Sequence, residues 1–235
     1  MKKDPISYYL FACVVLLVIA GVIININEQR KVDRSKIPEK VELYRGFQRW
    51  ITNLKNKGFE TNADEFKLIE ENEIYNTRWM VVYSFDDESK RKWFYNSLNN
   101  HRDIKKVVFS PSDQEFVDYR DTKRPGDLDG SSFEPNEVRF LGQKEDKIID
   151  ARILDCSARA NCYFDRAYFL DNDLFVISEF SRNIDKKDVE SPECFITDEC
   201  TYTIKLHVID LKQNKRLVYE SEPFHMIMSV MKKEL

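Results

Sequence analysis

The segment TYTIKLHVID, Thr201–Asp210, carries the clearest fold signal in this chain of 235 residues. Large apolar side chains occupy every second position along it. Successive side chains of a strand point to opposite faces of a sheet, so the pattern predicts a strand that buries one face. One face would hold Tyr202, Ile204, Leu206 and Val208, and the other Thr203, Lys205, His207 and Ile209. We therefore expect an antiparallel sheet packed against a core.

Comparable strand patterns fill the chain after Glu137. Runs of apolar and β-branched residues alternate with polar turns such as Asp171-Asn172-Asp173, which is typical of antiparallel β structure. Besides Thr201–Asp210, the predicted strands are Val138–Leu141, Ile148–Asp155, Tyr163–Leu170, Leu174–Ser181 and Arg216–Glu220. A meander, a small sandwich and a propeller-like arrangement all fit this spacing.

The part of the chain before this region mixes helices and strands. A helix is predicted from Pro38 to Lys57, because apolar residues recur along it at three- and four-residue steps and Gly58 suits its end. A second helix should begin near Asp87 and turn Trp93, Phe94 and Leu98 inward. Strands are predicted at Glu65–Glu70, Ile74–Phe85 and Lys105–Ser110. The fold class expected is therefore α+β, with a β-rich C-terminal half.

Residues 111–137 lack periodicity and collect turn-forming residues, including Pro125-Gly126 and Asp129-Gly130. We predict an irregular loop or linker here, with a solvated turn favoured over a calcium loop. The predicted organisation is a tail and membrane helix (1–27), a charged linker (28–37), an α+β part (38–110), this loop (111–137) and a β-rich part (138–235).

Ile6 to Ile24 form an apolar run of nineteen residues in which Ser7 is the single polar side chain. As a helix this run spans about 28 Å, close to the ~30 Å hydrocarbon thickness of a bilayer. It predicts an uncleaved, single-pass transmembrane signal-anchor. A cleaved signal ending at Ala20 and a lipoprotein site at Cys13 are less favoured, because the apolar run continues past both.

Basic residues flank the run on both sides, so charge does not orient it. The cysteines favour one orientation. Cys156/Cys162 and Cys194/Cys200 are two pairs with equal gaps of five residues, and pairs in an anchored chain predict disulfides, closed either within each pair or crossed between the two pairs. Free thiols and a four-thiolate zinc site are the alternatives, although zinc pairs usually have shorter gaps. Disulfides would place the C-terminal domain outside the cytoplasm, in a periplasm or at a cell surface.

Residues with an evident chemical role are scarce. The three histidines are far apart, and the chain has neither a phosphate-binding glycine loop nor a strained serine-nucleophile motif. No catalytic residue, cofactor or metal site is predicted, and with a net charge of −4 nucleic acid is not an expected partner. The weak candidates for an ion or polar ligand are four aspartates near the first cysteine pair, Asp155, Asp165, Asp171 and Asp173.

Two functions fit these observations. The favoured one is an anchored extracytoplasmic domain that binds a protein, a surface polymer or a small ligand. The alternative is an anchored hydrolase that uses carboxylates of the 111–137 loop or of the strand ends. A deep cleft with convergent carboxylates of displaced pKa would favour the hydrolase, and an open polar or aromatic face would favour binding.

Overall fold

A computed structural model describes residues 14, 15, 17, 18, 21, 35–59, 61–74, 80–120, 137–156, 162–182 and 197–227. The chain divides into two units, Met1–Ser35 and Lys36–Leu235. In the first unit Val14, Val15, Leu17, Val18 and Gly21 are helical and exposed, and Ser35 lies in a turn. Most of the predicted Ile6–Ile24 helix lies outside the described residues. Within the described residues, no helix combines the length and the apolar character needed to cross a bilayer.

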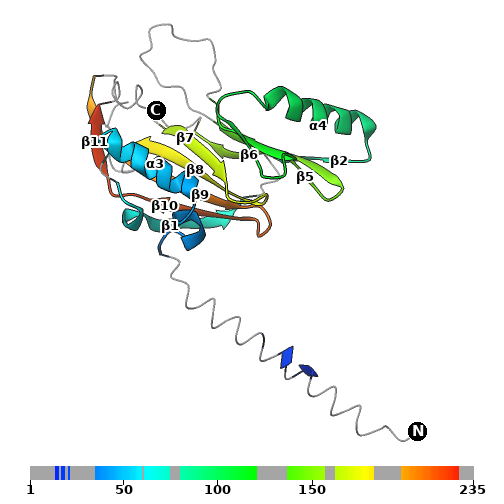
Figure 1. The fold of residues 1–235 in the computed structure, drawn as a ribbon, viewed down its shortest axis with the longest axis horizontal. Coiled ribbons are helices and arrows are strands. Elements are labelled where there is room, and N and C mark those ends of the chain that lie inside the picture. Colours follow the sequence, from blue (N-terminus) through cyan, green and yellow to red (C-terminus); the bar gives the residue numbers. More distant parts are fainter. Residues whose placement is uncertain are drawn as a thin grey trace, which may run out of the picture. The chain divides into compact units, whose positions relative to one another are not determined.

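The second unit contains two antiparallel sheets in its described part, which confirms the predicted α+β, β-rich class (Figure 1). Sheet A follows the order β1-β10-β9-β8-β7, with β11 pairing β9, and sheet B the order β2-β6-β5-β4-β3. The strands of sheet A are β1 (Lys67–Glu73), β7 (Cys162–Phe169), β8 (Leu174–Arg182), β9 (Glu199–Asp210), β10 (Lys215–Glu220) and β11 (Phe224–Ile227). Those of sheet B are β2 (Met80–Ser84), β3 (Val107–Phe109), β4 (Glu115–Asp118), β5 (Glu137–Lys144) and β6 (Lys147–Asp155).

Both sheets combine strands from the two halves of the sequence. β1 pairs with β10, and β2 pairs with β6, so each half contributes strands across the expected boundary at 111–137. β4 also lies inside that segment, which the sequence indicated to be irregular. Its run Glu115–Asp118 is short, and turn-forming residues flank it, so no period-two pattern develops.

The helix expected at Pro38–Lys57 is two helices, α2 (Glu39–Glu42) and α3 (Arg45–Asn56). The break falls at Tyr44, which has extended backbone angles and stacks its ring on Tyr168 at 5.2 Å. A Cβ at Gly46 would lie 2.5 Å from the Tyr44 ring, so the missing side chain of this glycine makes room for the stacked ring. Gly58 ends the helical region with a φ of +88°, as predicted.

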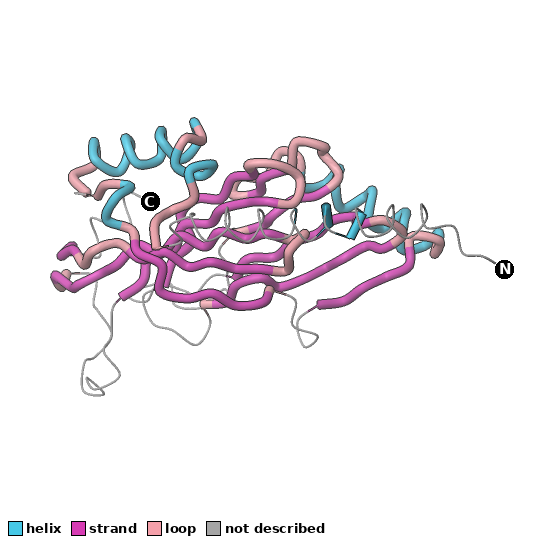
Figure 2. The backbone as a smooth tube through the Cα atoms, turned by 90° about the horizontal axis from the view of Figure 1, so that it is seen from below, coloured by secondary structure: helices cyan, strands magenta, loops and turns pink. Residues whose placement is uncertain are grey.

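The buried apolar residues that the structure describes form three clusters. The strands form the body of the unit, and the helices lie at its periphery (Figure 2). α2 and α3 bury Val41, Phe47, Trp50 and Leu54 against one face of sheet A. The other face of sheet A packs on sheet B through residues such as Phe140 and Phe175. α4 (Glu88–His101) covers part of the outer face of sheet B.

The chain passes from sheet B to sheet A between β6 and β7, and a disulfide closes this passage. Cys156 and Cys162 are bonded, with their Cα atoms 5.6 Å apart, which confirms a disulfide at this pair and decides for local over crossed pairing here. Cys200 is also disulfide-bonded, and Cys194 lies outside the described residues.

Candidate functional site

An open groove of about 400 Å³ lies beside α4 on the outer face of sheet B. Its walls come from α4 and from strands β4, β5 and β6. The lining residues are Trp93, Ser97, His101, Phe116, Asp118, Arg120, Glu137, Arg139, Leu141 and Asp150. The groove exists because α4 covers the apolar part of this face, including Leu141 and Ile148, and leaves the charged part open.

The helical wall of the groove follows from the geometry of α4. Trp93, Ser97 and His101 are four residues apart and therefore share one face of the helix. Asp87 caps the helix, because its carboxylate accepts hydrogen bonds from the backbone N–H groups of Ser89 and Lys90. Trp93 is 39% exposed, which corrects the prediction that it points into the core.

The floor of the groove is aromatic at the helix side. The His101 ring stacks on Phe116 with ring centres 4.7 Å apart, and its Nδ1 lies 2.7 Å from the carbonyl oxygen of Ser97. Phe116 is itself buried. His101 is therefore held flat, and Trp93 is the large aromatic side chain that the groove exposes to solvent.

The sheet wall is a strip of alternating charges, which we call the arginine–carboxylate strip. Asp118, Arg139 and Arg152 lie side by side on β4, β5 and β6, since Asp118 pairs with Arg139 and Arg139 with Arg152 in the strand register. Two arginines directly opposite each other would repel. The strip surrounds them with acids, and its members are Asp118, Arg120, Glu137, Arg139, Asp150, Arg152 and Asp155.

Each arginine of the strip contacts at least one carboxylate. Arg120 Nε lies 2.9 and 3.0 Å from the two oxygens of Asp118, and this bond raises the pKa of the guanidinium. Arg139 lies 3.2 Å from Asp150 and 3.9 Å from Glu137. Arg152 lies 3.1 Å from Asp155 and 3.7 Å from Glu137. The strip therefore offers many donors and acceptors with little net charge.

The four aspartates named from the sequence lie in different places. Asp155 belongs to the strip, while Asp165 accepts a 2.7 Å hydrogen bond from Nε1 of Trp50. Asp171 and Asp173 lie together in the β7–β8 turn, where the backbone N–H of Asp173 donates to Asp171. Asp171 is paired with Lys40 and Asp173 with Lys144. The structure thus brings only the last two aspartates close to each other.

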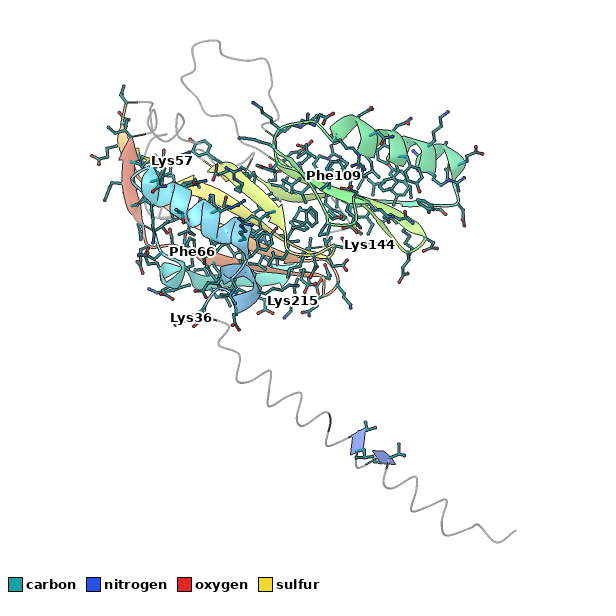
Figure 3. The ribbon with its side chains drawn as sticks, viewed as in Figure 1. Lys36, Lys57, Phe66, Phe109, Lys144 and Lys215 are labelled. Carbon is teal, nitrogen blue, oxygen red and sulfur yellow. A yellow bond between two sulfur atoms is a disulfide. The ribbon has the colours of Figure 1, made fainter. Side chains whose placement is uncertain are left out.

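A charged cluster joins the two sheets at the β7–β8 turn. Lys144 of β5 bridges Glu115 of β4 and Asp173, and Figure 3 labels Lys144 at this junction. The Glu115 side chain is 5% exposed, and its Oε2 has no hydrogen-bond partner among the described residues. Burial raises the pKa of Glu115 to about 6, despite the opposing effect of Lys144. Glu115 does not line the groove.

A second buried cluster lies between the sheets at the Cys156–Cys162 disulfide. The two sulfur atoms and a carboxylate oxygen of Glu179 all lie within 4.8 Å of one another. Glu179 Oε2 is 2.8 Å from Nε2 of His207. These side chains come from β8 and β9, on the face of sheet A that packs against sheet B.

Sequence reasoning did not find the groove. Its charged residues come from three strands, and each one alone resembles an ordinary solvated position. A signal did exist, because charged and apolar residues alternate in these strands, as in Glu137-Val138-Arg139 and Asp150-Ala151-Arg152. That alternation shows a polar face, but only the strand pairing brings the charges together.

Comparison with known proteins finds no matching family model, no matching curated protein and no matching solved structure. The function must therefore be inferred from the groove and the clusters themselves.

Proposed function

We propose that this chain is a membrane-anchored binding domain that holds a neutral, hydroxyl-rich polymer of the cell surface in the groove beside α4. The observation that carries the proposal is the combination of exposed Trp93 with the arginine–carboxylate strip in one open groove. An extended polysaccharide segment is the ligand class that fits this lining best.

The charge pattern of the groove supports an uncharged ligand. Its two lining arginines, Arg120 and Arg139, both contact carboxylates, so a polyanion would have to displace existing ion pairs. Sugar hydroxyls donate and accept hydrogen bonds, and they pair with carboxylates and guanidinium groups without breaking those contacts. The exposed Trp93 ring provides an apolar surface on which a sugar ring can stack.

The same geometry favours binding over hydrolysis. Glycoside hydrolysis needs a protonated carboxylic acid and a second carboxylate on opposite sides of the scissile bond. Asp118, Glu137 and Asp150 are each held by an arginine, which leaves none of them as an unpaired acid. Glu115, whose pKa is raised to about 6, lies outside the groove lining.

The membrane location rests on the apolar run Ile6–Ile24, whose described residues Val14, Leu17 and Val18 are helical with exposed side chains. The extracytoplasmic side rests on the Cys156–Cys162 disulfide, since structural disulfides persist in oxidising compartments. A polymer outside the cytoplasm would meet the groove there.

Binding to soluble oligosaccharides tests the proposal. The full-length protein in detergent would be titrated calorimetrically with cello-, chito-, malto- and β-1,3-gluco-oligosaccharides. At least one series should bind. Trp93→Ala should weaken that binding about tenfold or more, because truncating a tryptophan at the centre of a binding site costs about 2 kcal/mol or more.

Tyr95 provides the matched control, because it is an exposed aromatic residue of the same helix that does not line the groove. Tyr95→Ala should leave the affinity unchanged. Equal loss in both variants, or binding of an acidic polymer alone, would contradict the proposed ligand class.

Sidedness is tested separately with a protease added to intact and to permeabilised cells. The proposal expects the domain to be digested in intact cells once the outer barrier is opened, while a cytoplasmic marker stays whole. Digestion only after the cytoplasmic membrane is permeabilised would place the domain inside.

A further inference from the structure

The buried cluster at the Cys156–Cys162 disulfide is unusual for an apolar core. The Glu179 side chain is 0% exposed and that of His207 is 5% exposed. Burying a carboxyl and an imidazole costs free energy, even when they are paired as these two are. Apolar residues such as Phe164 and Ile177 share the same core, so the polar groups call for an explanation.

The donor set of this cluster is that of a zinc site. Zinc in proteins is bound tetrahedrally by thiolates, imidazoles and carboxylates. Two sulfurs and the Glu179 carboxylate already lie within 4.8 Å of one another, and His207 Nε2 is 2.8 Å from that carboxylate. We propose that reduction of the disulfide turns the cluster into a zinc site with Cys156, Cys162 and Glu179 as ligands, since their donor atoms all lie within 4.8 Å of one another, and with His207 holding the Glu179 carboxylate in place.

The chemistry balances with a dithiol as the reductant. The dithiol gives two electrons and two protons to the Cys156–Cys162 bond, which becomes two thiols, while the dithiol closes to its own disulfide. Zinc then replaces the two thiol protons, which pass to water. The metal and three anionic ligands carry a net charge of −1.

The gap of five residues between the cysteines is longer than the usual two to four of zinc pairs. Such short gaps are typical of cysteine pairs that lie together on one turn of the chain. Here Cys156 follows a strand of sheet B and Cys162 begins a strand of sheet A, and their Cα atoms are 5.6 Å apart. The sheets therefore bring the donors together, and either the disulfide or the metal would join them at the same point.

This inference does not depend on the proposed ligand of the groove. An oxidising compartment keeps the disulfide, and a reducing one admits the metal.

The test uses full-length protein in detergent, reduced and desalted without oxygen. Cobalt(II), a spectroscopic substitute for zinc, should bind at one equivalent per chain with the visible bands of tetrahedral thiolate coordination. The oxidised protein should bind none at this site. Alkylation followed by peptide mass analysis should show that zinc protects Cys156 and Cys162, while Cys200 of the same reduced chain is modified.

Glu179→Gln should weaken cobalt binding at least about tenfold. Replacing a residue that only supports a metal ligand already costs about that much affinity, and Glu179 is itself a ligand in the proposed site. The matched control is Glu220→Gln, since Glu220 is another carboxylate of sheet A, held by Thr203 and Lys205. Equal affinity of the two variants would overturn the inference. Uniform modification of all reduced cysteines with zinc present would also overturn it, and this readout needs no variant.

Discussion

At the scale of single residues, Glu115 shows how burial can outweigh an ion pair. Lys144 contacts its carboxylate, yet desolvation dominates and raises its pKa from 4.5 to about 6. The folded state therefore binds the proton more tightly than the unfolded state does. This contribution to stability is fully present below pH 4.5 and is lost as the pH rises through 6.

Glu115→Gln should remove this pH dependence. Between pH 4.5 and 6 the free energy of unfolding of the wild type should fall by about 1–2 kcal/mol relative to that of the variant. Urea unfolding at several pH values measures the difference. Glu73→Gln, a change at an exposed position of β1, should run parallel to the wild type. Parallel curves for Glu115→Gln as well would show that Glu115 does not titrate differently on folding.

Trp50 provides a second prediction at this scale. Its indole N–H is in a buried side chain and donates to Asp165, so Asp165→Ala would leave the donor without this partner. An unsatisfied buried donor costs about 1–3 kcal/mol. Urea unfolding should show that loss for Asp165→Ala, and a much smaller one for Asp64→Ala at an exposed position. Equal losses would mean that the hydrogen bond adds no stability.

At the scale of elements, α4 determines where the groove lies. The helix begins at an Asp87 cap, buries Phe94 and Leu98, and turns Trp93 outward. The sequence predicted this helix and its start, because capping and spacing are local signals. It did not predict the break between α2 and α3, which depends on Tyr44 stacking on Tyr168, a residue more than a hundred positions away.

Removing the cap should weaken both the helix and the groove. Asp87→Ala should lower the free energy of unfolding, because two backbone N–H groups lose their acceptor. Asp86→Ala, one residue earlier and outside the cap, should cost less than half as much. Chemical denaturation of both variants makes the comparison, and a larger loss for Asp86→Ala would refute the assigned cap.

At the scale of the whole molecule, the strand pairing is what the sequence left open. Alternation in Thr201–Asp210 correctly divided the faces of β9, with Tyr202, Ile204 and Leu206 in one core layer and Ile209 in the other. Nothing local shows that β1 pairs with β10 or β2 with β6. The groove depends on such pairing, so its residues could be recognised as polar strand positions but not as neighbours.

The Cys156–Cys162 disulfide joins the two sheets, so its loss should lower the stability of the whole unit. Closing so short a loop contributes about 2 kcal/mol in the simple chain-entropy model. The double variant Cys156→Ser/Cys162→Ser should therefore have a free energy of unfolding lower by that amount. It should unfold at a lower urea concentration, while the slope of the free energy of unfolding against urea concentration stays unchanged. Unchanged stability would mean that core packing alone holds the sheets together.

The central claim, that the groove beside α4 binds a neutral oligosaccharide, is tested most directly by following the tryptophan indole N–H signals by NMR during titration with oligosaccharides. We predict that the signal of Trp93 shifts in a saturable way, while that of Trp50, buried and bonded to Asp165, stays in place. A Trp93 signal unmoved by every neutral oligosaccharide, or equal shifts of the Trp50 and Trp93 signals, would contradict binding in the groove.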